Sequence, residues 1–284
     1  MEKNKQQQFI RTVIKIVLTV AAIYVVFRQL DVEQVKCVLV KSNAWWLIPA
    51  VILFTGSKVV SSIRLNQYFK NVNLTISEGY NLRLYWVGMF YNLFLPGGIG
   101  GDGYKVYLLH KRKDITVKKL VAATLWDRIN GLVGLVFLAL IIATFVDLPI
   151  LVAGQRYLIV ILTFLVFPGF YLITKLIYPD FTTSYVRTSG YSIVVQVMQL
   201  ICAYVILLSL GVEQNMLEYQ LVFLISSIVA VLPFTIGGVG ARELTFILGH
   251  EFLGIDKEVA IIFSLVFFLI TVLTSFFGVF LKGD

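Results

Sequence analysis

Six apolar runs, each long enough to cross a lipid bilayer, constrain the fold of this chain more than any other feature. They lie at residues 10–27, 44–63, 120–146, 157–178, 190–210 and 258–281. A transmembrane helix needs about 20 mostly apolar residues. Within the hydrocarbon region a helix satisfies all of its backbone polar groups internally. The runs therefore predict an all-α integral membrane protein, a helical bundle with several spans.

The composition agrees with this class. Of the 284 residues, 58% are hydrophobic and 14% are charged, and the mean hydropathy is +0.87. Soluble domains average about 25% charged residues. Apolar runs and short connections account for nearly all of the chain, so we expect one transmembrane domain over 1–284, with halves 1–150 and 151–284. We assign the net charge of +8 to basic residues beside the spans, and not to nucleic-acid binding.

Two glycine clusters interrupt the apolar pattern at corresponding points of the two halves. The first is residues 95–102, Leu-Pro-Gly-Gly-Ile-Gly-Gly-Asp, and the second is residues 232–243, which open with Leu-Pro and end with Arg-Glu. Proline ends a helix, and glycine permits tight bends and close approach of a ligand to the backbone. Paired breaks of this kind are typical of transporters built from repeats with discontinuous helices. Two ordinary loops between spans are the alternative.

The distribution of basic residues predicts a topology. The N-terminus is basic and is placed in the cytoplasm, as is the lysine-rich loop at 105–119. The loop at 211–219 has two glutamates and no lysine or arginine, so we place it outside. With these assignments, segment 79–103 begins and ends on the cytoplasmic side of the membrane, and segment 217–257 begins and ends on the external side. They are predicted to be re-entrant hairpins from opposite faces, in an inverted repeat, although 217–236 could also be a full span.

The pair Asp127-Arg128 lies in an apolar run, where ionisable residues usually face the protein interior and have partners. Adjacent residues on a helix do not face each other, so each needs a partner of its own. Asp102 and Glu243 are the candidates for Arg128. Lys105 follows Asp102 by three positions and therefore lies on the same helical face.

Two cations in the second apolar run, Lys58 and Arg64, are expected to extend to the membrane interface instead. Helices that restart after the glycine clusters would direct N–H groups and a positive dipole end toward an anion.

The sequence contains no motif that indicates catalysis or a cofactor. Cys37, Cys202, His110 and His250 are isolated from one another, and no nucleophile with a neighbouring base is recognisable. Gly98-x-Gly100-x-x-Gly103 matches a dinucleotide-binding pattern but lacks the surrounding βαβ unit, so we discard it. We therefore expect no metal, no cofactor and no enzymatic activity of this chain.

The segments 92–102 (Asn-Leu-Phe-Leu-Pro-Gly-Gly-Ile-Gly-Gly-Asp), 127–128 (Asp-Arg) and 233–243 resemble the lysylphosphatidylglycerol synthase transmembrane domain family, also called the flippase-like domain. The similarity covers nearly the whole chain. Lys105 stands where the family usually has arginine, and Asp127 where it often has glutamate. In the best-known members a cytoplasmic aminoacyl-transfer domain is fused to this region, and we expect no such domain here.

The resemblance implies a lipid flippase or transporter, which moves an anionic phospholipid or polyprenyl-linked lipid between leaflets of a prokaryotic cytoplasmic (inner) membrane. A membrane subunit or scaffold of a lipid- or glycolipid-modifying enzyme complex is the alternative. Membrane lipids, and in the second case an enzyme, are the expected partners. The residues expected to meet the substrate are Asn92, Gly97, Gly98, Gly100, Gly101, Asp102, Lys105, Asp127, Arg128, Gly237, Gly238, Gly240, Arg242 and Glu243.

Overall fold

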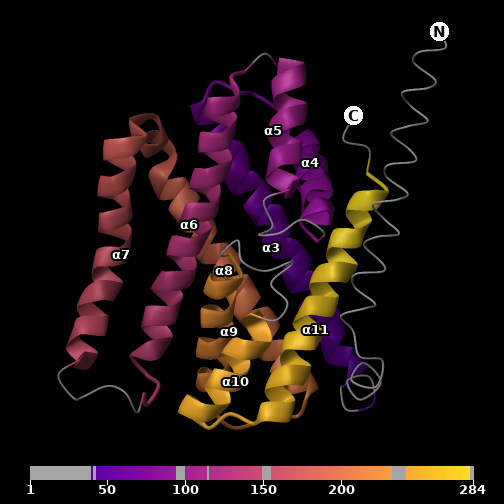
Figure 1. Ribbon diagram of the computed structural model, residues 1–284, viewed down its shortest axis with the longest axis vertical. Coiled ribbons are helices and arrows are strands. Elements are labelled where there is room, and N and C mark those ends of the chain that lie inside the picture. The colour runs from indigo at the N-terminus through magenta and orange to yellow at the C-terminus, as the bar shows by residue number, and fades with distance from the viewer. Residues whose placement is uncertain are drawn as a thin grey trace.

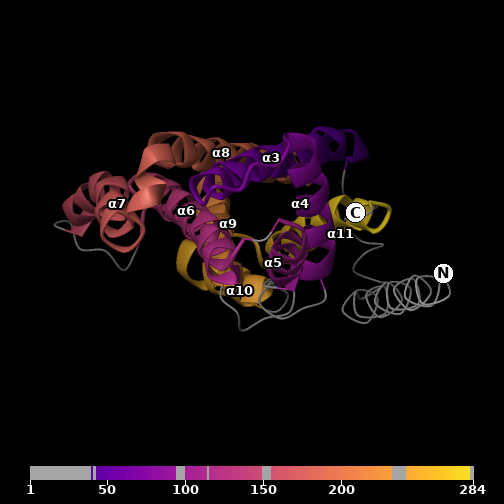
Figure 2. The same cartoon turned by 90° about the horizontal axis from the view of Figure 1, so that it is seen from above.

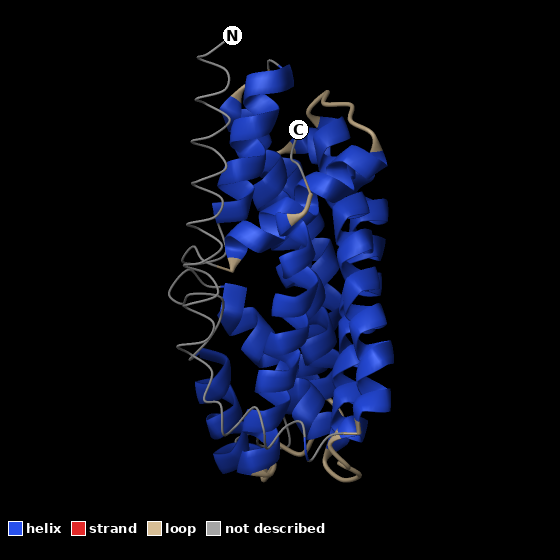
Figure 3. Cartoon of the chain, turned by 90° about the vertical axis from the view of Figure 1, so that its right-hand side faces the viewer, coloured by secondary structure: helices blue, strands red, loops and turns tan. Residues whose placement is uncertain are grey.

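A computed structural model describes residues 40, 43–93, 100–113, 115–148, 155–231 and 241–281, and these residues form helices and turns without a strand (Figure 3). Five helical segments are long and apolar enough to cross a membrane. They contain α3 (Ala44–Asn71), α6 (Val117–Ala143), α7 (Gln155–Ile177), α8 (Tyr185–Ser209) and α11 (Lys257–Phe276). The short 3-10 helices η1 (Pro179–Ser184) and η2 (Phe277–Val279) extend α8 and α11. The prediction of an all-α multispan membrane protein is confirmed, while the predicted span at 10–27 lies outside the described residues.

Four shorter helices form two pairs at opposite ends of the bundle. They are α4 (Glu78–Asn92), α5 (Gly100–Lys113), α9 (Met216–Val231) and α10 (Ala241–Leu253). At about 1.5 Å per residue none reaches the ~30 Å of a bilayer core. In Figure 1, α4 lies beside α5 in the upper half and α9 beside α10 in the lower half. Re-entry into the membrane and the inverted repeat stay predictions.

The lysine-rich segment at 105–119 was wrongly predicted to be a loop. Helix α5 continues to Lys113 and α6 begins at Val117, so most of the segment is helical. Its basic residues from His110 onward occupy the last turn of α5, where positive charge is favoured by the helix dipole.

The second helix of each pair ends in the same way. The Nδ1 atom of His110, near the end of α5, lies at hydrogen-bond distance from the carbonyl oxygen of Ile115, 2.7 Å away. The Nδ1 atom of His250, near the end of α10, is also 2.7 Å from the carbonyl oxygen of Ile255. In both places the next long helix begins two residues after the isoleucine. The two halves of the chain therefore share this local structure at an interval of 140 positions.

Helices α3 and α8 pack side by side in antiparallel orientation and connect the two ends of the bundle (Figure 2). At one end the backbone N–H of Asn43 donates to the backbone carbonyl oxygen of Ser209 over 2.8 Å. At the other end the Tyr68 hydroxyl donates to Thr188 Oγ1 over 3.3 Å. Helix α7 is peripheral, and most of its apolar side chains are exposed, as expected for a surface that faces lipid.

The bundle has two apolar cores with polar residues between them. The lower core, in the half of Figure 1 that holds α9 and α10, includes Phe54, Leu135, Ile206, Phe223, Phe263 and Phe267. The upper core includes Leu65, Phe69, Leu84, Leu109, Leu120, Trp126 and Phe181. Along α3, α6 and α8 the stretches between the two cores, residues 57–64, 127–131 and 188–196, contain most of the buried polar side chains of these helices. We call these stretches the polar layer.

Close contact between two glycines sets the position of α5 against α4. A Cβ atom added to Gly101 would lie 1.9 Å from the carbonyl oxygen of Gly88. The Gly101 amide donates to Asn92 Oδ1 over 2.7 Å. The first turn of α5, which carries Asp102, is thereby fixed against α4.

Gly101→Ala should therefore lower the stability of the protein sharply. An added methyl group must displace backbone, and overpacking typically costs ~1–3 kcal/mol. Gly103→Ala, two positions along the same helix, is the matched control, because no atom lies within 4 Å of its added Cβ. The control should be neutral or stabilising by up to ~1 kcal/mol. Thermal unfolding of the two variants in detergent, followed by circular dichroism, measures this, and equal melting temperatures would contradict the contact.

Candidate functional site

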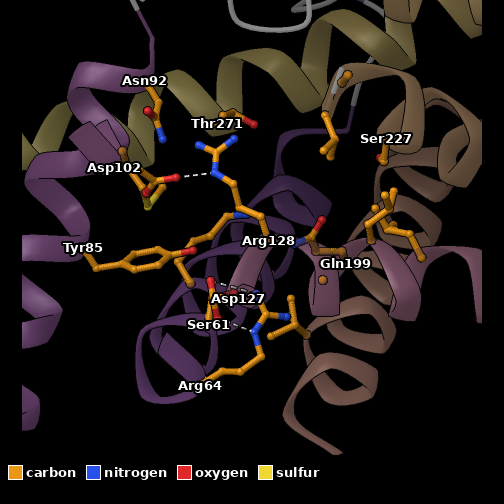
Figure 4. Close-up of a pocket in the computed structure, with 18 of the residues that line it drawn as sticks. Ser61, Arg64, Tyr85, Asn92, Asp102, Asp127, Arg128, Gln199, Ser227 and Thr271 are labelled. Atoms are coloured by element: carbon orange, nitrogen blue, oxygen red, sulfur yellow. Dashed lines mark hydrogen bonds and ion pairs between the residues drawn. The ribbon is translucent and has the colours of Figure 1, made fainter. Parts of the chain in front are cut away.

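A cavity of about 330 Å³ lies within the polar layer (Figure 4). Helices α3, α4, α5, α6, α8, α9 and α11 all contribute to its wall. Its polar lining residues are Lys58, Ser61, Arg64, Tyr85, Asn92, Asp102, Lys105, Asp127, Arg128, Gln196, Gln199, Ser227, Thr271 and Ser275. Its volume is within the range of ~300–1,000 Å³ that is usual for small-molecule sites.

Two cations share the carboxylate of Asp102 at one side of the cavity. Lys105 Nζ lies 2.6 Å from Asp102 Oδ1, and Arg128 Nε donates to Asp102 Oδ2. The Lys105 ammonium also lies 4.9 Å from the centre of the Tyr85 ring. In Figure 4 the Arg128 side chain extends between Asp102 and Thr271. Of the two candidate partners of Arg128, Asp102 forms an ion pair with it, and Asp102 and Lys105 lie on one helical face as predicted. The side chain of Glu243, the other candidate, lies outside the described residues.

A second ion pair, Arg64–Asp127, lies deeper in the polar layer. Arg64 Nε donates to Asp127 Oδ1 over 2.7 Å and Nη2 donates to Oδ2 over 3.3 Å. The two side chains are only 6% and 8% exposed. Arg64 was predicted to extend to the membrane interface, and this is wrong. The carboxylate of Asp127, 63 positions away in the sequence, holds the guanidinium inside the bundle. Lys58 also lines the cavity, with Nζ 4.4 Å from the centre of the Phe54 ring.

Hydrogen bonds connect this ion pair to α8. Arg64 Nη1 donates to Ser192 Oγ over 2.7 Å, and Ser192 Oγ donates to Asn130 Oδ1 over 2.8 Å. Asn130 Nδ2 in turn donates to the Tyr68 hydroxyl over 2.6 Å. A buried charge is tolerated when its remaining hydrogen-bonding groups are satisfied. The network supplies those partners from three helices.

The model of a known family matches the chain over residues 12–185 and 175–278, and its description is "Lysylphosphatidylglycerol synthase TM region". The chain belongs to this family. The resemblance found in the glycine clusters and in the Asp-Arg pair is thus confirmed, and the cavity is formed within the family's membrane region.

Relatives in this family differ in how much of their length the chain covers. A phosphatidylglycerol lysyltransferase of Staphylococcus aureus (strain MSSA476) is 24% identical over an alignment 278 residues long, which covers 93% of this chain but 32% of the relative. A UPF0104 membrane protein of Pyrococcus horikoshii is 21% identical over an alignment 296 residues long, which covers 87% of this chain and 88% of the relative. The chain thus spans about a third of the lysyltransferase and most of the Pyrococcus protein.

The structure places the remaining predicted site residues as follows. Asn92 lines the cavity, but its Oδ1 accepts the Gly101 N–H and so satisfies the start of α5. Gly100 and Gly101 are the first residues of α5 and are absent from the cavity wall described here. The predicted glycines Gly97, Gly98, Gly237, Gly238 and Gly240 lie outside the described residues, as do the side chains of Arg242 and Glu243.

Several lining residues were not predicted from the sequence. Lys58, Ser61 and Arg64 recur at intervals of three along α3, which places them on one helical face. That spacing was the one signal that could have identified Arg64. Gln196, Gln199 and Ser227 belong to no motif, and only the packing of α8 and α9 brings them to the cavity.

Gly131 provides space beside Arg64. A Cβ atom at this position would lie 3.2 Å and 3.3 Å from the two terminal guanidinium nitrogens. Gly131 also lines the cavity. The absence of a side chain therefore leaves room for the guanidinium in the polar layer of this family member.

We expect Arg64→Leu to destabilise the fold strongly, because it leaves Asp127 buried without its cation. Breaking a buried pair from one side typically costs ~3–5 kcal/mol. The double variant Arg64→Leu/Asp127→Leu should regain much of this loss, because apolar replacement of a whole buried pair is often neutral. Unfolding in mixed detergent micelles, followed by circular dichroism, measures both.

The control is the exposed pair Lys70–Glu78, whose Nζ and Oε1 lie 3.0 Å apart. Lys70→Ala should cost less than ~1 kcal/mol because solvent screens the pair. If Arg64→Leu were no more harmful than Lys70→Ala, the central role of the buried pair would be refuted.

Proposed function

We propose that this chain moves an anionic, phosphate-bearing lipid, either a phospholipid or a polyprenyl-linked lipid, between membrane leaflets. The observation that carries the proposal is the cavity in the polar layer, where Lys105 and Arg128 converge on one carboxylate. Guanidinium and ammonium groups are the usual partners of phosphate in proteins. The family membership supports a substrate drawn from membrane lipids.

Asp102 has a specific part in this proposal. In the empty state its carboxylate keeps two cations partnered at the cavity wall, which avoids the large cost of burying them alone. A lipid phosphate entering the cavity would share or replace those contacts. The site would then hold an anion without having to assemble cationic groups around it.

The placement of the short helix pairs supports alternating access. The pairs α4–α5 and α9–α10 lie at opposite ends of the bundle (Figure 1), and residues from α4, α5 and α9 line the same cavity. Rocking of one half against the other around a fixed central site is the usual motion of repeat-built transporters. The proposal assigns no chemical step to this chain. A gradient, a partner protein or downhill flow would drive the movement.

A second candidate is a membrane subunit or scaffold of a lipid- or glycolipid-modifying enzyme complex. It is favoured by the match to phosphatidylglycerol lysyltransferases, in which the matched region is about a third of the protein. In that case the chain would co-purify with an enzyme, and reconstituted vesicles would show no lipid movement.

We also propose that the membrane is a prokaryotic cytoplasmic membrane and that the N-terminus is cytoplasmic. Exposed basic residues gather at the end of the bundle where α5 ends and α6 begins: Lys111, Arg112, Lys113, Lys118 and Lys119. The connection after α8, at the opposite end, has the exposed Glu213 and no basic residue. Basic residues favour the cytoplasmic side.

Single-cysteine labelling tests this orientation. In a background without Cys37 and Cys202, Lys113→Cys should react with a membrane-impermeant maleimide only in inverted vesicles. Glu213→Cys should react only in right-side-out cells or vesicles. Labelling of both positions from the same side would refute the topology.

Arg128 is the residue whose loss should stop transport. Arg128→Ala should abolish movement of a headgroup-labelled anionic phospholipid in reconstituted vesicles. Arg128→Lys should reduce the rate by at least about tenfold, because lysine lacks the planar fork that makes two parallel hydrogen bonds, each worth ~1.5–3 kcal/mol with a charged partner.

Arg156 provides the matched control, since it forms an exposed ion pair with Asp147 away from the cavity. Arg156→Ala should keep the wild-type transport rate. Wild-type transport by Arg128→Ala would remove this residue from the substrate site.

A further inference from the structure

Two carboxylates belong to the described lining of the cavity, and they hold their cations differently. Asp127 accepts hydrogen bonds from Nε and Nη2 of a single guanidinium, that of Arg64, and these two side chains are only 8% and 6% exposed. Asp102 is shared by two cations from different helices, Lys105 of α5 and Arg128 of α6. The Arg128 side chain is 27% exposed. Asp102 is therefore the carboxylate whose partners an entering ligand reaches first.

The charged and titratable groups that face Asp102 come from α5 and from the two helices packed against it. They are Lys105 on α5 itself, Arg128 on α6 and, beside the Lys105 ammonium, Tyr85 on α4 (Figure 4). At pH 7 lysine and arginine already carry their protons, and a tyrosine is already neutral. Because Asp127 keeps its own guanidinium, Asp102 is the group of the described lining that is able to take up a proton when its partners change.

A lipid phosphate bound by Lys105 and Arg128 would stand beside the Asp102 carboxylate. Two negative charges about 4 Å apart, at an effective dielectric constant of about 20, repel each other by a factor of about a thousand in equilibrium constant. Protonating an ordinary aspartate at pH 7 costs about the same factor. The Asp102 side chain is only 13% exposed, and burial disfavours the charged form further. The N-terminal turn of α5 opposes this by only about two- to fivefold, so the protonated carboxyl is favoured.

We infer that Asp102 takes up one proton when an anionic lipid binds to Lys105 and Arg128, so that the proton and the lipid phosphate cross the membrane together. The proton comes from water on the side where the lipid enters. It returns to water on the other side when the lipid leaves and the carboxylate recovers its two cations. One proton and one phosphodiester charge cross without net transfer of charge, and a proton gradient drives the movement. This inference rests on the proposed function, because it requires a lipid phosphate at these two cations.

Proton uptake on lipid binding tests the inference directly. The probe is a short-chain phosphatidylmethanol, whose phosphodiester keeps its single charge between pH 6 and pH 8. It is titrated into the full chain in mixed micelles by calorimetry, in two buffers that differ in ionisation enthalpy and contain no phosphate. The difference in heat gives the number of protons bound. We expect about one proton per lipid at pH 7 and, by linkage, about tenfold tighter binding at pH 6 than at pH 7.

The variant Asp102→Asn has the shape of the protonated acid and cannot titrate. It should take up no proton, and it should bind the probe at pH 8 as tightly as the wild type does at pH 6, because no carboxylate then competes for Lys105 and Arg128. A purely structural role of Asp102 would weaken binding instead. The matched control is Asp147→Asn. Asp147 also pairs with an arginine, Arg156, but lies away from the described cavity wall, so this variant should keep the proton uptake and the pH dependence.

Transport in vesicles supplies a second readout. An acyl-chain-labelled phosphatidylmethanol is followed in reconstituted vesicles with pH 6 outside and pH 8 inside. The initial rate of movement into the inner leaflet should exceed the rate at equal pH by about tenfold. A membrane potential imposed at equal pH should leave the rate unchanged, since no net charge crosses. Asp102→Asn should lose the acceleration by the pH gradient.

Three results would overturn the inference. Equal wild-type binding at pH 6 and pH 8 without proton uptake, still dependent on Arg128, rejects the proton and leaves the proposed function standing. Proton uptake that persists in Asp102→Asn assigns the proton to another group and refutes the role of Asp102. Absence of binding at every pH rejects both the proton linkage and the proposed function. The wild-type proton count decides the matter even if Asp102→Asn fails to fold.

Discussion

The rest of the structure depends on how charge is accommodated in the middle of an apolar bundle. Transferring an ion into such surroundings costs several kcal/mol even after relaxation, so every buried charge needs a close partner. Arg64 and Asp127 meet this requirement across α3 and α6, and Ser192 adds a contact from α8. These contacts fix the positions of the three helices relative to one another along the bundle axis. The apolar cores above and below pack against this arrangement.

The second charged group, around Asp102, depends on how closely backbones can approach. Because Gly88 and Gly101 lack side chains, α5 lies directly against α4. This contact places Asp102 beside the polar layer, where the Arg128 side chain of α6 donates a hydrogen bond to its carboxylate. A packing constraint between two short helices thus positions the electrostatic group that makes the cavity suitable for an anion.

Sequence reasoning predicted the contacts that lie close to recognisable motifs. Asp102 borders a glycine cluster and Arg128 interrupts an apolar run, and each needed an opposite charge. Asp102 could therefore be named as a candidate partner of Arg128, beside Glu243. Arg64 was missed because it lies near the end of an apolar run, where a basic residue can equally well extend to the interface. The cavity residues Gln196, Gln199 and Ser227 were missed because isolated glutamines and serines in a helix carry no pattern that separates a cavity residue from a packed one.

The sequence by itself determined the helical membrane class, the spans within the described residues, the family and the need of Arg128 for a carboxylate partner, with Asp102 as one of two candidates. These depend on the hydrophobicity and length of local segments and on the cost of an unpaired charge in lipid, which are properties of the residues themselves. Only the tertiary structure decided that Arg64 turns inward to Asp127 and that uncharged polar residues of α8 and α9 line the same cavity as the charged residues of α3, α5 and α6. Those outcomes depend on the relative height and rotation of helices far apart in the chain, because side-chain contacts across a bundle are set by packing.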